Sequence, residues 1–211
     1  MGKDEQLIMV IAREILLGSD HFEGFKAHNE TDYESKILES HTYMKRGPVE
    51  TDHSIKQPIA YCLIVNPALK QIFAYQRASQ DAKYSEKRLQ GKWAWGVGGH
   101  IEKIDIREGN PIQASLLREL EEEVEMNGTI TGTKTLGYIN DDSDDVGKIH
   151  FGILYLIETD STIVKPKDPE IAEGKLRSIE ALDEIRSSRR VEEWSKIALK
   201  PLKYHFSNSS T

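Results

Sequence analysis

The residues with the clearest chemical potential are acidic side chains crowded into positions 118–126 (RELEEEVEM). An α-helix turns about 100° per residue, so Glu119, Glu122 and Glu123 would share one arc of about 100°. Like charges held this close make each other costly to ionise, and a bound hard cation removes that cost. Mg²⁺ prefers oxygen ligands and usually keeps water or phosphate oxygens as further ligands. The pattern therefore predicts a helix face that holds a divalent metal against a phosphate-bearing molecule.

Acidic helical segments are also common on solvated surfaces, so the neighbouring residues must decide between the two interpretations. A Gly98-Gly99 pair stands upstream, directly after a short predicted strand. Glycine lets the backbone approach an ion or a phosphate closely because it has no side chain. Arg118 precedes Glu119 and can pair with a carboxylate and fix its direction. The opposite side of the helix is expected to pack through its apolar residues, which are Ala114, Leu117, Leu120 and Val124.

The remaining pattern predicts a mixed α/β fold. Residues 59–65 are apolar and β-prone, and Asn66-Pro67 marks a turn. Residues 71–76 are β-prone again, so this segment predicts a hairpin of two strands. The acidic helix should begin at Pro111 with Asn110 as N-cap, run to about Met126 and end at Asn127-Gly128. Further strands are predicted at residues 93–97, 129–139, 148–158 and 175–178, and further helices at 179–186 and 191–199, the last stopped by Pro201. This order predicts a sheet covered by helices.

The bulk composition limits the class of protein. Of the 211 residues, 38% are hydrophobic and 30% are charged, which is typical of a globular chain. The formal charge of -7 argues against a broad basic surface for duplex nucleic acid, and the apolar runs are too short to span a membrane. The single cysteine, Cys62, excludes an intramolecular disulfide and fits a cytoplasmic location. We expect an N-terminal extension, residues 1–57, packed on a main domain, residues 58–211.

These residues resemble the Nudix hydrolase superfamily of MutT-type enzymes. The family's box reads as glycine, five residues, glutamate, seven residues and then R-E-U-x-E-E-x-G-U, where U is a bulky aliphatic residue. Residues 118–124 fit the heart of that pattern, and residues 98–102 (GGHIE) resemble its start, with Gly99 as the first glycine. The similarity covers about residues 58–199. Segments upstream also resemble a little-characterised branch of predicted MutT-family phosphoesterases.

The sequence departs from the family pattern at three places. Five more residues than the pattern allows precede Arg118, around residues 103–107. Counted back from Arg118, Asn110 stands where the pattern has its upstream glutamate. The last glycine of the box is replaced by Glu125. The acidic residues that could orient Arg118 instead are Asp105 and Glu108.

The resemblance implies an α/β/α sandwich with a mixed β-sheet and a loop–helix–loop metal site. By matching positions, the metal ligands would be Glu119, Glu122, Glu123 and the carbonyl of Gly99, with Mg²⁺ as cofactor and Mn²⁺ able to replace it. Arg118 and the three glutamates would form the catalytic set, with Glu119 or the later Glu173 as general base. Family enzymes cleave a diphosphate linkage with water that the metal activates. The expected substrate is therefore a nucleoside diphosphate derivative or a related small molecule.

Other residues are candidates for contacts with substrate phosphates, and each has a structural alternative. His100 could instead cap the backbone of its loop, and Arg77, Lys87 and Arg88 could be solvated surface charges. Glu173 could be an ordinary surface residue. Trp93 and Trp95 are expected to alternate along a strand, with one facing the core and the other a cleft. The acidic residues at 141–145 are expected to form a solvated hairpin end.

Two other classes of function remain open. A Nudix-fold module that binds or senses a nucleotide without cleaving it is favoured by the lost glutamate at Asn110. An isomerase acting on an isoprenoid diphosphate would need a catalytic cysteine, and Cys62 lies in an apolar segment. The N-terminal extension is also a candidate interface element of a homodimer.

Overall fold

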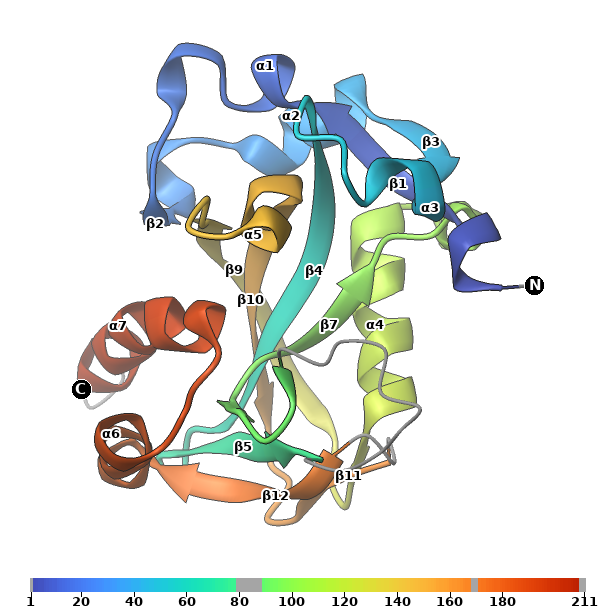
Figure 1. Ribbon diagram of the computed structural model, residues 1–211. Coiled ribbons are helices and arrows are strands. Elements are labelled where there is room, and N and C mark those ends of the chain that lie inside the picture. Colours follow the sequence, from blue (N-terminus) through green and yellow to red (C-terminus); the bar gives the residue numbers. More distant parts are fainter. Residues whose placement is uncertain (1, 79–88, 168–170, 209–211) are drawn as a thin grey trace. The chain divides into compact units, whose positions relative to one another are not determined.

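The computed structural model of the chain describes residues 2–78, 89–167 and 171–208 (Figure 1). The chain divides into two compact units. Unit 1 comprises Met1–Tyr61, Gly98–Glu119 and Thr135–Tyr155, and unit 2 comprises Cys62–Val97, Leu120–Lys134 and Leu156–Thr211. Strands and helices occur in both units, which confirms the predicted mixed α/β class.

The central sheet of unit 1 has neighbouring strands in the order β4 (Ile55–Asn66), β10 (His150–Thr159), β9 (Ile130–Asn140) and β2 (Gly24–Ala27). Three of these strands, β4, β9 and β10, also contribute residues to unit 2. Strand β1 (Leu7–Ala12) pairs with β3 (Thr42–Lys45) and with the start of β4, and β7 (Val97–His100) pairs with β4. The short helices of this unit are α1 (Arg13–Leu16), α2 (Tyr33–Ser40), α3 (Arg46–Val49) and α5 (Asp145–Ile149).

The core of unit 1 includes side chains from the N-terminal segment. Tyr33 and Ile37, both in that segment, are fully buried. The Tyr33 ring packs edge-on against the rings of Tyr138 and Phe151, with centroids 4.9 and 5.3 Å apart. The N-terminal residues therefore help to build this core and are not an appendage to it.

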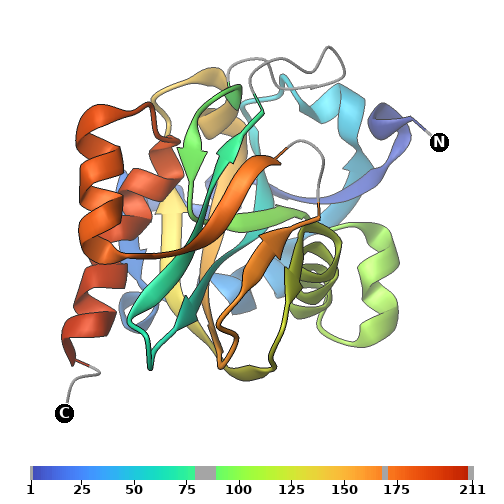
Figure 2. The same cartoon turned by 90° about the horizontal axis from the view of Figure 1, so that it is seen from below.

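Unit 2 is formed by a second group of strands and the two last helices. Strand β5 (Gln71–Arg77) pairs antiparallel with the end of β4, which confirms the predicted hairpin. It also pairs with β6 (Trp93–Ala94) and β12 (Ile171–Ser178), while β8 (Val124–Met126) pairs with β11 (Val164–Pro166). Helices α6 (Ile179–Ser188) and α7 (Glu193–Asn208) lie side by side in Figures 1 and 2, joined by an ion pair of 2.6 Å between Lys203 and Asp183.

The strand predicted at residues 93–97 is broken in two. Strand β6 ends at Ala94 and β7 begins at Val97, so Trp93 and Trp95 do not alternate along one strand. Both indole rings are buried, and Trp95 Nε1 donates to the carbonyl oxygen of Ser195 at 2.6 Å. The expectation that one tryptophan faces a cleft is therefore wrong.

Two predicted helix ends are also wrong. Helix α4 (Pro111–Glu123) stops three residues before Met126, because residues 124–126 pair with β11 as strand β8. Helix α7 continues through Pro201 to Asn208. A proline inside a helix loses one backbone hydrogen bond. Burial of Leu202 and Phe206 beyond the proline offsets that loss.

Candidate functional site

The acidic helix α4 begins as the sequence predicts. Asn110 Oδ1 accepts hydrogen bonds from the backbone N–H groups of Ile112 at 3.0 Å and Gln113 at 3.5 Å, so Asn110 is the N-cap. Pro111 occupies the first helical position, where its missing N–H costs nothing. The cap fixes where the helix starts and therefore where each later side chain points.

The packing face of α4 differs in part from the prediction. Ile112, Leu116 and Leu120, spaced four residues apart, are buried, whereas Leu117 is 52% exposed. The prediction placed Leu117 on the buried side and was wrong, because the stripe of buried residues is centred on Leu116. The helix is unbroken from Pro111 to Glu123, so helical geometry still places Glu119, Glu122 and Glu123 within one arc of about 100°. The buried stripe overlaps one edge of this arc, because Leu116 lies only about 20° from Glu123 around the helix axis, so the prediction that the helix packs by the side opposite the carboxylates is wrong.

Arg118 is held by a buried aspartate. Its Nε and Nη2 donate to the two carboxylate oxygens of Asp105 at 2.9 and 3.0 Å, and its Nη1 donates to Glu119 Oε1 at 2.6 Å. Burial lowers the pKa of the Arg118 guanidinium, but the hydrogen bonds to Asp105 and the charge of Glu119 outweigh it, and the pKa is raised. A bidentate arginine–carboxylate pair is geometrically specific, so Arg118 holds Glu119 in a fixed direction.

The pairing of Asp105 with Arg118 resolves the apparent loss of the upstream glutamate. Asp105 was one of two residues expected to replace it, and the side chain of the other, Glu108, lies outside the described part of the structure. Counted forward from Gly99, the acidic position of the family pattern falls on Asp105 itself. The five extra residues therefore follow Asp105. Counting in this direction would have identified it from the sequence.

The segment between Gly99 and α4 is a short 3₁₀ helix, residues Lys103–Glu108. Its first turn is closed by reciprocal hydrogen bonds between Glu102 and Asp105, in which Asp105 Oδ2 accepts from the Glu102 N–H at 2.8 Å. The Asp105 carboxylate thus fixes both the loop that follows Gly99 and the side chain of Arg118.

Gly98 and Gly99 lie where a larger side chain would not fit. A Cβ atom at Gly98 would collide with the carbonyl group of Ala60, and one at Gly99 would collide with the Glu119 carboxylate. The Gly99 backbone and the Glu119 carboxylate therefore lie against each other with no side chain between them. Carboxylate and backbone carbonyl oxygens are the ligands that a hard cation such as Mg²⁺ prefers, so the Glu119 carboxylate beside the Gly99 backbone fits such an ion.

His100, next to Gly99, is bound to the protein through its ring. Its Nε2 lies 2.7 Å from Gln57 Oε1 and 3.2 Å from His150 Nε2. Burial is the main cause that holds the pKa of His100 well below its usual value, and the neighbouring His150 adds to it. The ring is therefore neutral at pH 7. Its carbonyl oxygen accepts from Arg118 Nη2 at 3.0 Å. Contact between His100 and a substrate phosphate remains a prediction.

The other candidate substrate contacts lie in unit 2 or outside the described residues. Arg77 Nε donates to Glu192 at 2.5 Å, and Arg77 Nη2 donates to the Tyr75 hydroxyl at 3.2 Å. Glu173 lies within β12, since the strand begins earlier than predicted, and its carboxylate is exposed and 4.0 Å from Arg177. Lys87 and Arg88 fall in the range 79–88, which the structure does not describe. Cys62 is buried in β4, as expected.

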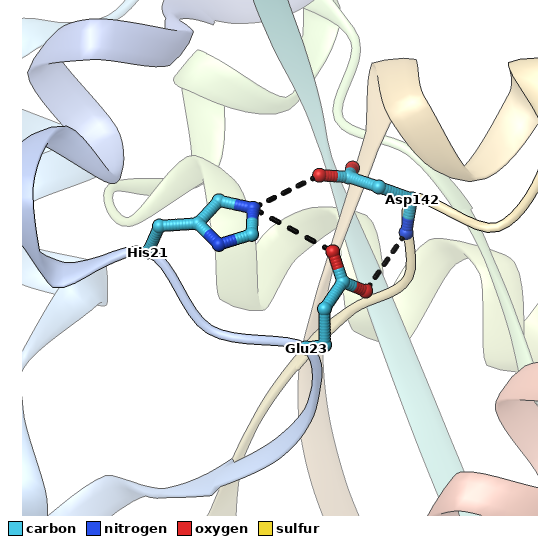
Figure 3. Close-up of side chains that lie close together, drawn as sticks. All are labelled: His21, Glu23 and Asp142. Atoms are coloured by element: carbon cyan, nitrogen blue, oxygen red, sulfur yellow. Dashed lines mark hydrogen bonds and ion pairs between the residues drawn. The ribbon is translucent and has the colours of Figure 1, made fainter.

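A second group of potential metal ligands is formed by His21, Glu23 and Asp142, drawn in Figure 3. Asp142 already pairs with Arg13 and with the buried ammonium of Lys56, whose Nζ lies 2.8 Å from Asp142 Oδ1. Burial raises the pKa of Asp142, but hydrogen bonds from Arg13 and Lys56 outweigh it and hold the pKa well below its usual value. The Asp142 carboxylate is balanced by these cations and does not need a metal. The expectation that residues 141–145 are simply a solvated hairpin end is wrong for Asp142.

Gln57 and His150 also lie beside the site, although no sequence motif identified them as its neighbours. Both are buried polar residues, one at the head of an apolar strand and the other at the start of β10. A buried polar side chain needs hydrogen-bond partners, so polar residues at the ends of apolar strands were the available signal.

Fold and site together define a mixed α/β protein whose acidic helix α4 faces the Gly98-Gly99 pair, which we call the glycine corner. A family model described as NUDIX domain matches residues 55–196. Protein YmaB of Bacillus subtilis (strain 168) is 33% identical over 210 residues, which is 94% of this chain and 98% of that protein. The crystal structure of Tm1382, a candidate Nudix hydrolase, matches with a TM-score of 0.76 at 25% identity, covering 95% of this chain and 100% of Tm1382. The NUDIX hydrolase from Alicyclobacillus acidocaldarius matches with a TM-score of 0.53 at 13% identity, covering 72% and 96%.

The chain therefore belongs to the NUDIX family and is an enzyme of the Nudix hydrolase type. The match to Tm1382 also confirms the Nudix fold that the resemblance implied. Among the described residues, no helix combines the length and the apolar character that crossing a membrane requires.

Proposed function

We propose that the chain is a divalent-metal-dependent hydrolase that cleaves a diphosphate linkage in a nucleoside diphosphate derivative or a related small molecule. Mg²⁺ is the proposed cofactor, and Mn²⁺ is expected to replace it. The observation that carries the proposal is the close approach of the Gly99 backbone to the Glu119 carboxylate, held by Arg118 and Asp105. A cytoplasmic location and a homodimer remain predictions from the sequence.

The proposed metal ligands are the carboxylates of Glu119, Glu122 and Glu123 and the carbonyl oxygen of Gly99. When bound, the cation supplies neutralisation of phosphate charge and acidification of water. Glu119 holds its direction because Arg118 Nη1 donates to Oε1. Arg118 is thus a positioning residue, and Glu119 is the proposed first candidate for general base. Glu173 is the second, and it sits on β12 with an exposed carboxylate.

The first test is Glu123→Gln, which removes one negative charge without changing the size of the side chain. A metal at such a site contributes several kcal/mol to the transition state, so turnover should fall by about 100-fold or more. Phosphate release from nucleotide sugars, dinucleotides and oxidised nucleotides, with Mg²⁺ and with Mn²⁺, measures the effect.

The matched control is Glu121→Gln, the same chemical change on the same helix. Glu121 is exposed and lies about 200° around the axis from Glu119. This variant should keep wild-type turnover and wild-type thermal stability. Equal turnover of wild type and Glu123→Gln on a cleaved substrate would contradict the proposed role of Glu123.

The sensor alternative loses the feature that favoured it. That feature was the missing upstream glutamate, and Asp105 pairs with Arg118 in its place. A ligand that raises the melting temperature but is never hydrolysed, with either metal, would restore the sensor as the better interpretation.

A further inference from the structure

A chain of hydrogen bonds in unit 1 links the glycine corner to three other segments. Gln57, on β4, is fully buried, and its Nε2 donates to the carbonyl oxygen of Val49 in α3 at 3.0 Å. This bond leaves Gln57 Oε1 directed at His100 Nε2, 2.7 Å away. His150, on β10, is also buried, and its Nδ1 lies 2.8 Å from the carbonyl oxygen of Val146 in α5.

The partners fix the direction of every proton in this chain. Val146 offers its carbonyl oxygen here, so His150 Nδ1 must be the donor, and in the neutral imidazole His150 Nε2 carries a lone pair. Gln57 Oε1 is an acceptor, so His100 Nε2 must carry the proton that it receives. The same proton faces the lone pair of His150 Nε2 at 3.2 Å. The ring of His100 is therefore held by two neutral acceptors, one on each of two strands.

Gly99 immediately precedes His100, so fixing the ring fixes the peptide that joins the two residues. The next peptide unit, between His100 and Ile101, is also held, because the His100 carbonyl oxygen accepts from Arg118 Nη2 at 3.0 Å and from Ser115 Oγ at 3.2 Å. One residue further, the Ile101 carbonyl oxygen accepts from Met9 N–H of β1 at 2.7 Å. The glycine corner is thus bonded to α4 through its backbone and to β4 and β10 through a side chain.

We propose that Gln57 and His150 are positioning residues that, through His100, hold the Gly99 carbonyl in the orientation needed to bind the divalent metal. This inference rests on the proposed metal site. It assigns His100 to the support of the metal-binding loop, where its Nε2 is already used, in preference to contact with a substrate phosphate. Partners that orient a ligating group typically change metal affinity by about 10- to 100-fold when they are removed.

The test is the dissociation constant of Mn²⁺, measured by electron paramagnetic resonance or by calorimetry on the full-length chain at a temperature well below unfolding. Gln57→Met keeps the length of the side chain and removes both hydrogen bonds. It should weaken Mn²⁺ binding by about 10-fold or more. His150→Phe keeps the ring and removes its nitrogens, and it should act in the same direction. The second variant keeps the proposal testable if the first does not fold.

Two comparisons separate positioning from general loss of stability. Tyr138→Phe is the matched control, because it removes a buried hydroxyl of unit 1 that accepts from the Tyr33 N–H at 3.1 Å and lies 2.8 Å from His28 Nδ1. It should lower the melting temperature and leave the Mn²⁺ affinity within about twofold of wild type. In a His100→Leu background, Gln57→Met should weaken Mn²⁺ binding by less than about twofold more, because its effect passes through His100.

Failure of this inference differs from failure of the proposed function. If a Glu122→Gln/Glu123→Gln double variant binds Mn²⁺ as wild type does, the metal site itself is wrong, and the inference falls with it. If that double variant loses Mn²⁺ while Gln57→Met and His150→Phe bind it with wild-type affinity, only the positioning role is wrong. Equal weakening by Tyr138→Phe would overturn the positioning role as well.

Discussion

At the scale of single residues, the ion pair between Asp105 and Arg118 determines the direction of the Glu119 carboxylate on the acidic helix α4. Asp105 is 4% exposed, and both of its oxygens are occupied by the guanidinium. Removing one partner of such a pair leaves a charge without compensation, which is costly in a buried position. The pair therefore belongs to the fold and, through Glu119, to the proposed chemistry.

Asp105→Asn tests this coupling. The amide cannot neutralise Arg118, so the guanidinium should shift toward Glu119 and change the direction of that carboxylate. We expect kcat/KM to fall by about 10- to 100-fold on whichever diphosphate the wild type cleaves. Asp105→Glu, which restores the charge, should recover a large part of the loss. A kcat/KM of Asp105→Asn equal to wild type would show that Arg118 does not need this partner.

The residues of the site differed in how far the sequence could identify them. Glu119, Glu122 and Glu123 were predictable because a helical period fixes their common face. Gln57 and His150 could be recognised only as polar residues near the ends of apolar strands. Their approach to His100 comes from strands that are distant in the sequence, and no local spacing encodes it. Their ligating or positioning roles remain predictions.

At the scale of elements, local signals marked the starts of helices better than their ends. The start of α4 follows from Asn110 and Pro111, which act on the backbone within one turn. The end of α4 depends on pairing between residues 124–126 and β11, about forty positions later. Pro201 misled the prediction of α7 for the same reason, because buried contacts beyond it outweigh a local preference.

Asn110→Ala should measure the cap directly. Losing an N-cap side chain costs about 1 kcal/mol, which for a chain of this size lowers the melting temperature by about 2–4 °C. Gln113→Ala is the matched control, because Gln113 is exposed on the same helix and alanine is the better helix former. Calorimetry on both variants checks the expectation. An unchanged melting temperature for Asn110→Ala would mean that the cap does not stabilise α4.

At the scale of the whole molecule, the N-terminal residues prove to be part of the unit that contains the glycine corner. Strand β1 pairs with β4, and Ile8 forms a bridge with Glu102, next to the 3₁₀ segment. The contacts place residues 1–61 in unit 1 together with residues 98–119. The apolar residues of this segment predict that it packs on the protein, but they do not identify its partner strands, because strand pairing over this distance leaves no local signature.

A cluster of charges also ties the N-terminal segment to the rest of unit 1. Arg13 of α1 and Lys56 of β4 both donate to Asp142, and Lys56 Nζ also donates to the carbonyl oxygens of Gly147 at 2.9 Å and His150 at 3.0 Å. His21 Nε2 lies 3.1 Å from Asp142 Oδ2, and the Glu23 carboxylate accepts from the backbone N–H of Asp142, as Figure 3 shows. The ammonium of Lys56 is fully buried, so Asp142 supplies the charge that keeps it there.

This cluster predicts a pH dependence of stability. The pKa of Asp142 is lower in the folded chain than its ordinary value of 3.8, so the folded state favours the charged form. The resulting stabilisation is fully present above the unfolded pKa and is lost as the pH falls through the folded pKa. Wild type should therefore lose stability as the pH falls below about 4, in urea unfolding at a series of pH values.

Asp142→Asn should remove the part of the pH dependence of stability that comes from the Asp142 carboxylate. At pH 7 the variant leaves Lys56 and Arg13 without their carboxylate and should be less stable by about 3–5 kcal/mol. The stability difference from wild type should shrink as the pH falls, because protonation of Asp142 then imposes the same loss on wild type. Asp141→Asn, in the same loop and accepting from the Ser143 N–H, is the matched control and should follow the wild-type curve. Parallel curves for wild type and Asp142→Asn down to the acid limit would mean that Asp142 does not link the N-terminal segment to unit 1 through its charge.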